Sequence, residues 1–304
     1  MDRNEWLSAR RKCITGTDIS AIVGLNRWKS PVDVFMEKLG LTEDVPENEP
    51  MFWGKAIEPL IAERWAKENG VPIKQGEFIR KGIYGGTPDY LSDTKLLEIK
   101  TVGLRSASFW GEPGSDQIPE QYLCQVQWYL NLTDMQKADV PVLIGGQEYR
   151  VYHVMRNDKL IEILTNAAET FWNRYVMNEE APPLDSSKGS EKYLASFFPK
   201  NRGNTIQATV DISDAARDLN GVRKQIEELD TKKSELENRI KYAIGTNDGV
   251  SDRTFKATWK MSKDSEKTDW EKLARSLNIN NQLIRDFTVS KPGSRRFLFT
   301  YHGE

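Results

Sequence analysis

The sequence predicts an α/β (or α+β) domain with a mixed central sheet flanked by helices, followed by a separate helical region. Helix-like segments come first, then three strand-like segments, a helix, a hairpin and a closing helix that ends at a Pro-Pro pair at residues 182–183. A heptad pattern begins only beyond residue 205. We therefore expect a domain at residues 1–183, a polar linker at 184–205 and a C-terminal helical and mixed region at 206–304.

Four helical segments are expected before any strand. Residues 2–12 form a basic helix, and residues 14–18 form a turn rich in capping groups that leads into a short helix closed by Gly24. Residues 30–40 begin with Pro at the first turn and end with Gly. Residues 52–70 have the spacing of an amphipathic helix. Its expected apolar side consists of Phe52, Ala56, Leu60, Ala62, Trp65 and Ala66.

Strands and helices then alternate. Residues 103–119 are irregular and glycine-rich, which suits either a loop on the substrate side or a disordered connection. Gly145 and Gly146 mark a tight hairpin. The expected strands are 73–80, 84–91, 95–102, 137–144 and 147–154, and the expected helices are 120–130 and 158–177.

The stretch from residue 85 to residue 100 carries the strongest chemical signal. If its turn is centred on Asp93 and Thr94, antiparallel pairing places Asp89 opposite Glu98, with Cβ atoms roughly 5 Å apart. Two facing carboxylates repel each other, so a cation between them would be stabilising. Lys100 lies on the same side of its strand as Glu98. This arrangement predicts a magnesium site with a charge-stabilising lysine; a turn acid beside a solvated Glu-x-Lys face is the alternative.

Two further features have both a functional and a plain structural interpretation. A helix beginning near Thr17, with Arg10 or Arg11 close by, would attract a phosphate group; otherwise it is an ordinary N-cap with surface arginines. Glu58 is a lone acid among apolar residues on its helix. It is either solvated or turned inward as a third carboxylate of a metal site.

Composition excludes several classes of protein. The 304 residues carry a formal net charge of -2, so any polyanion site must be local. Two cysteines, Cys13 and Cys124, are too few for a disulfide framework or a zinc ribbon, and no ATP-binding P-loop is present. No apolar run is long enough to span a bilayer, and the first residues lack the apolar core of a signal peptide. We expect a cytoplasmic protein without a membrane partner.

The C-terminal region contains a coiled-coil-like helix at residues 212–243. Its apolar positions recur in a three-four spacing interrupted only by Lys233. The pattern predicts packing against another helix, either from this chain or from a partner subunit. Residues 250–301 suggest strands around a helix. Their basic and aromatic end suits either single-stranded nucleic acid or a charged sheet edge.

Taken in order, these signals resemble one family. The ordered matches are Arg10 with residues 14–17, Trp53-Gly54 with Glu58, Pro88-Asp89, Glu98-Ile99-Lys100, and Tyr122 with residues 125–127. Over residues 1–180 the chain resembles the YqaJ-like viral recombinase family, to which lambda exonuclease belongs, within the PD-(D/E)XK nuclease superfamily. The fold that this resemblance implies is the PD-(D/E)XK nuclease core.

The resemblance also implies roles for the acidic residues. Asp89 and Glu98 match metal-binding carboxylates, and the backbone carbonyl of Ile99 matches a further ligand. Glu58 matches the helix acid that completes a second metal position. The implied cofactor is Mg²⁺, for which Mn²⁺ may substitute.

The remaining matches concern catalysis and the DNA end. Lys100 matches the catalytic lysine, and Gln125 matches a glutamine near the attacking water. Arg10 and Thr17 match a pocket for a 5'-phosphate, to which Arg11 is a possible contributor. The family often has Ser where this chain has Thr17, and Thr keeps the hydroxyl.

The implied activity is 5'-to-3' degradation of one strand of linear double-stranded DNA, which leaves 3' overhangs for a single-strand annealing protein. The family implies a homo-oligomer, a toroidal trimer, acting in a bacterium or a phage-infected host cell. Alternatives are a RecB-like, Cas-type or restriction-type nuclease, and an adaptor that binds DNA without cleaving it and recruits a recombinase. The Cas-type enzymes usually carry four clustered cysteines, which this chain lacks.

Overall fold

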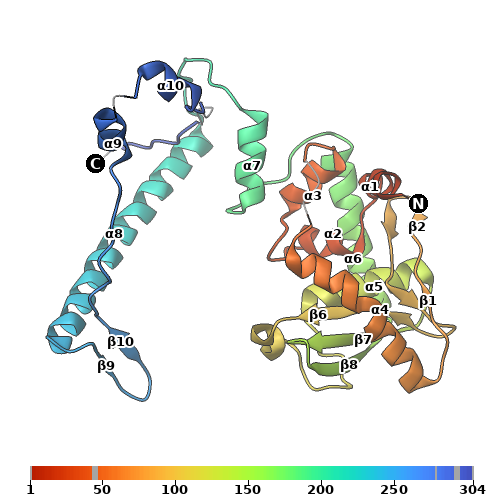
Figure 1. The fold of residues 1–304 in the computed structure, drawn as a ribbon. Helices are drawn as coiled ribbons and strands as arrows, with labels where there is room; N and C mark the ends of the chain where they lie inside the picture. The colour runs from red at the N-terminus through yellow and green to blue at the C-terminus, as the bar shows by residue number, and fades with distance from the viewer. Residues whose placement is uncertain (1, 43–46, 278, 291–294, 303–304) are drawn as a thin grey trace. The chain divides into compact units, whose positions relative to one another are not determined.

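A computed structural model describes residues 2–42, 47–277, 279–290 and 295–302, in two compact units, Met1–Phe197 and Phe198–Glu304 (Figure 1). The first unit ends with α7 (Lys188–Phe197). Tyr193 of α7 packs edge-on against Phe35 of α3 (Pro31–Lys38), with ring centroids 6.0 Å apart. The first unit therefore extends beyond the expected boundary at residue 183. The expected polar linker contains a helix because its aromatic residues dock onto α3.

The expected helices of the first unit are confirmed, with small shifts at their ends. Local signals define several of these ends: Asp2 caps α1, Ser30 caps α3 immediately before Pro31, and Gly70 ends α4 at a positive φ of 65°. Apart from α3 and α7, the helices are α1 (Arg3–Arg11), α2 (Gly16–Ile22), α4 (Glu49–Asn69), α5 (Glu120–Thr133) and α6 (Asp158–Phe171). A π-helical turn (Trp172–Val176) extends α6, and a 3₁₀ segment (Leu104–Phe109) lies in the irregular interval.

The central sheet is mixed, as expected. It contains β1 (Lys74–Gln75), β4 (Tyr90–Leu91), β5 (Leu96–Leu97), β6 (Lys100–Val102), β7 (Lys137–Ile144) and β8 (Glu148–Met155). Both β5 and β6 run parallel to β7, whereas the β1–β4, β4–β5 and β7–β8 pairs are antiparallel. A second, two-stranded sheet pairs β2 (Ile79–Lys81) with β3 (Tyr84–Gly86). The α/β class with a mixed sheet and flanking helices is confirmed.

Each of the first three expected strands is split into two shorter strands. At the first two breaks, the Gly76 N–H donates to the Asp89 carbonyl over 2.9 Å. A Cβ atom on residue 76 would lie 2.0 Å from the Pro88 carbonyl oxygen, so only glycine fits. This close approach of two backbone segments ends the regular strands on both sides.

The third break, between β5 and β6, positions the acidic site. Both strands pair with β7 in the same register, so the intervening Glu98 and Ile99 lie beside Val140 and Pro141. The Glu98 N–H still donates to the Asp139 carbonyl at 3.1 Å, but Pro141 has no N–H to continue the ladder. The strand therefore loses its regular pairing at the residues that carry the predicted chemistry.

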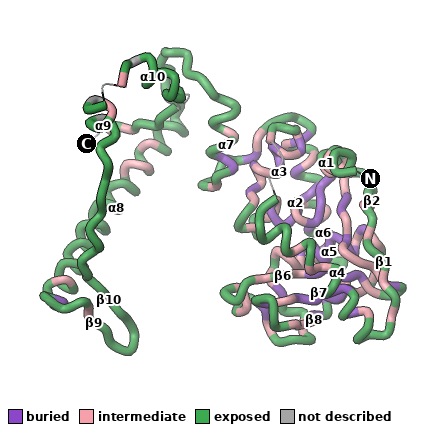
Figure 2. Tube along the Cα trace, in the orientation of Figure 1, coloured by how far each residue is buried: buried purple, intermediate pink, exposed green. Residues whose placement is uncertain are grey.

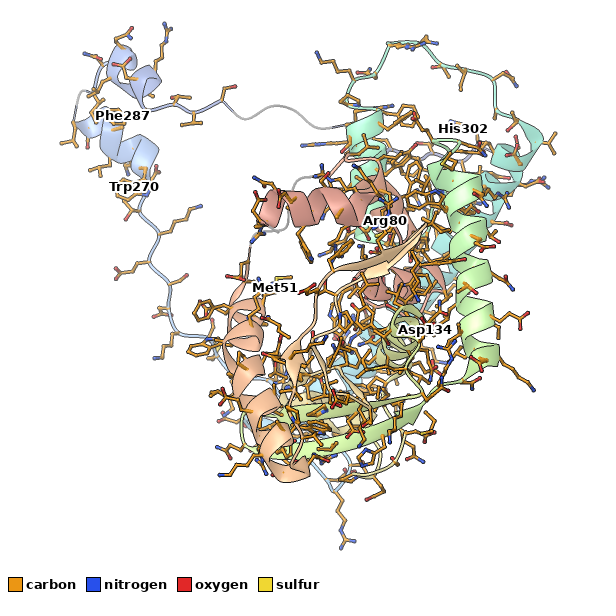
Figure 3. The ribbon with its side chains drawn as sticks, turned by 90° about the vertical axis from the view of Figure 1, so that its right-hand side faces the viewer. Met51, Arg80, Asp134, Trp270, Phe287 and His302 are labelled. Carbon is orange, nitrogen blue, oxygen red and sulfur yellow. The ribbon has the colours of Figure 1, made fainter. Side chains whose placement is uncertain are left out.

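Helix α4 presents a different face to the body than expected. Figure 3 shows α4 along one side of the first unit, with Met51 near its N-terminal end. Ala62 and Trp65 are buried as expected. Phe52 and Leu60, also expected on the buried side, are 50% and 64% exposed, and Ile61 is buried in their place. Apolar residues occur around much of the circumference of α4, so their periodicity alone does not determine which face is buried. Contacts of α4 with β6 and β7 select it instead.

A buried carboxylate fixes α4 to the sheet. Asp139 of β7 accepts hydrogen bonds from Trp65 Nε1 at 3.0 Å and from Lys95 Nζ at 2.7 Å. Its other oxygen lies 2.7 Å from Nδ1 of His153 on β8. One buried side chain therefore connects α4 with strands at the centre of the sheet.

Replacing Asp139 with Ala is expected to destabilise the protein by about 3–5 kcal/mol, because it leaves Lys95 and Trp65 without their acceptor. Urea unfolding measures this loss. The control is Glu68→Ala, which removes an exposed ion pair with Arg64 on the same helix and should cost less than about 1 kcal/mol. Equal losses in the two variants would show that the Asp139 network does not stabilise the fold.

The second unit is built around the long helix α8 (Val210–Ile244), which contains the expected heptad segment 212–243. A hairpin of β9 (Gly249–Ser251) and β10 (Lys256–Thr258) follows, then α9 (Trp270–Ser276) and α10 (Asn281–Asp286). Residues 295–302 are described and form no helix or strand, so they are not the charged sheet edge that was one of the two interpretations of this end. No helix in the described parts of the chain is both long and apolar enough to span a membrane.

Candidate active site

The hairpin that carries the acidic residues has the predicted register. Tyr90 pairs with Leu97 and Leu91 with Leu96. The Ser92 N–H closes the turn by donating to the Lys95 carbonyl over 2.9 Å. One step further along this register, Asp89 faces Glu98 across the two strands.

Asp89 and Glu98 are held differently. The Asp89 carboxylate accepts the Ile99 N–H at 2.7 Å, which fixes its position against the neighbouring strand. Glu98 is 1% exposed and forms an ion pair through Oε1 with the Lys100 ammonium group. Its second oxygen, Oε2, is buried and has no hydrogen-bond partner. A buried carboxylate oxygen left unpaired is costly, and a positively charged ligand would remove that cost.

The acidic groups of this site are all shifted toward their protonated forms. Burial, with a contribution from the Asp89 charge, raises the pKa of Glu98 to about 8. Burial and the same Asp89 charge raise the pKa of Glu58 to about 7. Burial also raises the pKa of Asp89, against the opposing effects of Lys100 and the Ile99 N–H. Such crowding of carboxylates is typical of functional sites.

Lys100 is the cation of this group. Burial opposes its charge, but the Glu98 and Asp89 carboxylates outweigh that effect and raise the pKa of Lys100. Its Nζ lies 5.2 Å from the ring centroid of Tyr122 on α5. Lys100 is therefore a fixed positive charge between the two carboxylates and an aromatic wall.

The structure turns Glu58 inward. It is half-buried on α4, and its carboxyl group is close enough to Asp89 and Lys100 for both charges to change its pKa. Among the described residues, however, no three His, Cys, Asp or Glu side chains converge closely enough to form a complete metal centre. Glu58 therefore interacts electrostatically with Asp89 and Glu98, but the three side chains do not converge into one complete coordination site.

The residues present fit a divalent cation. The unpaired Oε2 of Glu98 and the raised pKa values of three neighbouring acids are the features that a bound cation would relieve. Carboxylate and carbonyl oxygens are the ligands that Mg²⁺ and Mn²⁺ favour. The Ile99 N–H points toward Asp89. In extended backbone the carbonyl group of the same residue points to the same side of the strand. Asp89, Glu98, Ile99 and Glu58 thus supply suitable oxygen atoms.

Gln125 contacts a tyrosine on its own helix. Its Nε2 donates to the Tyr129 hydroxyl over 3.3 Å, one helical turn along α5. Burial raises the pKa of Tyr129, and the nearby charges of Glu98 and Asp89 raise it further, while Arg10 opposes them. Tyr129 therefore lies within electrostatic reach of both the acidic group and Arg10. The sequence signal for this link is the i, i+4 spacing of Gln125 and Tyr129.

The structure brings Arg10 and Thr17 together. Arg10 Nη2 donates to Thr17 Oγ1 at 3.4 Å, and its guanidinium lies 4.6 Å from the Trp6 ring centroid. Arg11 is exposed, and its Nη1 lies beside Gly40 instead. The helix begins at Gly16, near Thr17 as expected, and Thr15 occupies the N-cap position.

A buried ion network that the sequence analysis missed supports this turn. Asp18 accepts the Thr15 N–H at 2.9 Å and the Thr15 hydroxyl at 2.8 Å. It also pairs with Lys38 at 2.6 Å and with Lys29 at 2.7 Å. Burial opposes its ionisation, but Lys29 and Lys38 outweigh burial and hold the pKa of Asp18 well below its usual range. The Thr-x-x-Asp capping box was the available sequence signal.

Lys38 connects this network to Arg10. Its Nζ donates to the Arg10 backbone carbonyl at 2.9 Å. The Gly85 N–H, from the strand that leads to Asp89, donates to the Ile14 carbonyl at 2.9 Å. The arginine-bearing turn and the acidic hairpin are therefore attached to each other by backbone contacts.

An aromatic cavity of about 430 Å³ adjoins Lys100 by way of Tyr122. Arg27 lies over the rings of Trp28 at 4.3 Å and Phe109 at 5.6 Å. Aromatic faces with a guanidinium group suit a flat, negatively charged ligand such as a nucleotide. An Arg-Trp pair in a turn-rich segment was the sequence signal for this wall. The cavity is lined by Leu25, Arg27, Trp28, Thr101, Val102, Gly103, Ser106, Phe109, Trp110, Pro119, Glu120, Gln121 and Tyr122.

The chain matches a known protein family, both through the family model and through a sequence relative. The family model of the YqaJ-like viral recombinase domain matches residues 5–136. Protein YqaJ of Bacillus subtilis (strain 168), itself uncharacterised, is 30% identical over 275 residues, covering 86% of this chain and 84% of that protein.

Solved structures resemble part of this chain at lower sequence identity. An alkaline exonuclease from Laribacter hongkongensis has a TM-score of 0.47 and 21% identity, covering 58% of this chain and 93% of that one. A phage-related exonuclease from Haemophilus somnus 129PT has a TM-score of 0.44 and 14% identity, covering 58% of this chain and 100% of that one. The sequence relationship to the Bacillus protein extends over most of both chains. This chain belongs to the YqaJ-like viral recombinase family.

Proposed function

We propose that this protein is a metal-dependent DNA exonuclease that degrades one strand of linear duplex DNA in the 5'-to-3' direction. One observation carries the proposal: Asp89, Glu98 and Lys100 meet on one hairpin, where Glu98 keeps a buried oxygen without a partner. Membership of the YqaJ-like viral recombinase family agrees with it.

Each of these side chains has its own role in the hydrolysis of a phosphodiester. Asp89, Glu98, the Ile99 carbonyl and Glu58 would hold Mg²⁺, or Mn²⁺ in its place. The bound cation would supply Lewis-acid stabilisation of the negative charge on the phosphoryl group. Lys100 keeps its proton and stabilises charge that develops on the non-bridging oxygens, or orients the attacking water. Gln125, held by the Tyr129 hydroxyl, orients the same water.

The Arg10–Thr17 pair gives the enzyme its direction. A terminal 5'-phosphate bound there is fixed by a guanidinium group and a hydroxyl group, which are good partners for phosphate oxygens. Tyr129 is influenced by the charges of both Arg10 and Glu98, which supports a common site for the pocket and the acidic group. The aromatic cavity beside Tyr122 would receive a base of the strand that is cut.

The test compares linear duplex DNA with the same DNA as a covalently closed circle, each with and without Mg²⁺. We expect Mg²⁺-dependent loss of the linear form alone. Equal cleavage of both forms would overturn the end-directed activity. Loss of neither form, with binding retained, would favour the adaptor that binds DNA without cleaving it.

Replacing Arg10 with Ala is expected to reduce the preference for 5'-phosphate over 5'-hydroxyl ends by about 10- to 100-fold. This is the loss expected for a charge-assisted hydrogen bond worth about 1.5–3 kcal/mol. The preference is measured as the ratio of initial rates on the two ends. Arg11→Ala is the matched control, since Arg11 lies on the same helix but beside Gly40. An unchanged ratio in the Arg10 variant would remove Arg10 from the phosphate pocket.

The remaining expectations follow from the family. We propose that the 3' overhang passes to a single-strand annealing protein, and that the nuclease domain assembles as a trimer. The proposed setting is the cytoplasm of a bacterium or a phage-infected host cell.

A further inference from the structure

Helix α8 carries an apolar seam that the described residues leave uncovered. Six of its large seam residues are between 39% and 65% exposed. Figure 2 shows α8 as exposed along almost all of its length. The seam consists of Ile212, Ala215, Leu219, Val222, Ile226, Leu229, Lys233, Leu236, Ile240 and Ala243.

The described helices of the same unit are too short to cover this seam. Helix α8 has 35 residues, whereas α9 has 7 and α10 has 6. At about 1.5 Å per residue, α8 is roughly 50 Å long, several times the length of either. A helix of equal length and matching pattern would cover the seam, and a second copy of α8 provides one.

We infer that two copies of α8 pair as an antiparallel, two-stranded coiled coil. In a parallel pair each seam residue meets its own copy. Lys233 would then face Lys233, while Ala215 and Ala243 would each face another alanine. One layer would place two ammonium groups together, and two layers would leave gaps in the packing.

The antiparallel pair removes these defects. Suppose that Ile226 of one helix lies opposite Leu229 of the other. Every small seam residue then faces a large one, and Lys233 faces an aliphatic side chain. Alternating large and small residues across an interface is the arrangement that fills it. The layers are Ile212 with Ala243, Ala215 with Ile240, Leu219 with Leu236, Val222 with Lys233, and Ile226 with Leu229, each occurring twice by symmetry.

The residues flanking the seam support self-pairing. In the antiparallel alignment Asp218 lies opposite Arg239, and Arg223 lies opposite Asp230. No like charges face each other among the flanking positions of residues 216–239. Opposite charges also meet in a parallel pair, so the charges favour a second copy and the packed layers decide its direction.

The chain's own C-terminal segment is the competing occupant. Arg223 Nη1 donates to the Phe299 carbonyl at 3.0 Å, and the guanidinium lies 4.7 Å from the Phe299 ring. Phe297 and Leu298 beside it remain exposed. The segment therefore contacts the flank of α8 at Arg223 while the large seam residues stay open.

Single-cysteine variants of the full chain distinguish these arrangements. Leu219→Cys and Leu236→Cys are prepared separately and then mixed, and each sample is treated with a short bis-maleimide crosslinker and run on a denaturing gel. We expect a dimer band at least five times stronger in the mixture than in either variant alone, because Leu219 of one copy faces Leu236 of the other. Leu236 is exposed in the single chain, and Leu219 is partly exposed. Circular dichroism matching the wild type shows that the variants fold.

The matched control mixes Lys224→Cys with Thr231→Cys, which occupy the outward side of the same helix and should not crosslink. The two native cysteines are buried, so the wild type should give no band. Equal bands from the single variants would overturn the antiparallel direction. Absence of a band from every sample would overturn the pairing and assign the seam to another occupant. Because the band reports contact between α8 helices, oligomers formed by the first unit do not affect its interpretation.

Discussion

Lys100→Ala is expected to lower kcat on linear duplex DNA by 10²- to 10³-fold or more, with DNA binding largely retained. Lys100 is the only cation paired with Glu98 among the described residues, and nothing else in that part of the chain places a positive charge at this point. Removing a fixed charge that stabilises the transition state is worth about 2.7–4 kcal/mol. Single-turnover digestion gives the rate, and fluorescence anisotropy without divalent cations gives the affinity.

Lys74→Ala is the control for this variant. Lys74 is an exposed lysine on β1 of the same sheet and is not among the charges that shift the pKa values of Glu58, Asp89 or Glu98, so its loss should leave the rate unchanged. Thermal unfolding of both variants separates a catalytic effect from misfolding. Retained turnover in a folded Lys100 variant would remove Lys100 from the mechanism.

Glu98→Gln is expected to abolish turnover and at the same time stabilise the metal-free protein at alkaline pH. The amide keeps the shape of the side chain but removes a buried charge that lies near Asp89 and Glu58. Removing this charge should raise the free energy of unfolding by about 1–2 kcal/mol. Thermal unfolding above pH 8 without divalent cations measures the gain, and addition of Mg²⁺ should shift the wild type upward but not the variant.

The pH dependence has a definite sign. From about pH 5 upward the folded protein keeps a proton on Glu98 until about pH 8, its pKa, and on Glu58 until about pH 7, its pKa. The unfolded chain releases these protons near pH 4.3. Because the folded state binds more protons in this range, the free energy of unfolding of the metal-free wild type falls as pH rises.

Mg²⁺ reverses this trend, because binding requires the carboxylates to lose their protons and stabilises the folded state. The Mg²⁺-induced rise in Tm should therefore grow from pH 6 to pH 9. A shift that is independent of pH, or equal in Glu98→Gln, would contradict the assignment of Glu98 as a ligand.

The parts of the site that are local in sequence were predictable. The turn at Asp93 and Thr94 sets the hairpin register, and that register alone places Asp89 opposite Glu98. The 3.6-residue period predicted the helix that bears Glu58, and in the structure this acid is half-buried. Arg10 and Thr17 are seven residues apart, and their contact follows from one short turn between two helices.

The parts that depend on distant residues were not predictable. The strand break at Glu98 comes from Pro141, which lies on another strand more than forty residues later. The buried face of α4 is selected by the bond from Trp65 to Asp139, and not by the apolar spacing of Phe52 and Leu60. No local pattern encodes these contacts, because each needs the folded sheet to bring its partners together.

The most direct test of the central claim uses linear duplex DNA with a 5'-phosphate on both strands and one strand labelled at either its 5' or its 3' end. With Mg²⁺, the 5' label should be released early as a mononucleotide, while the 3' label stays on a shortening strand. Early release of the 3' label, release of both labels at the same rate, or release without a divalent cation would contradict a metal-dependent 5'-to-3' exonuclease.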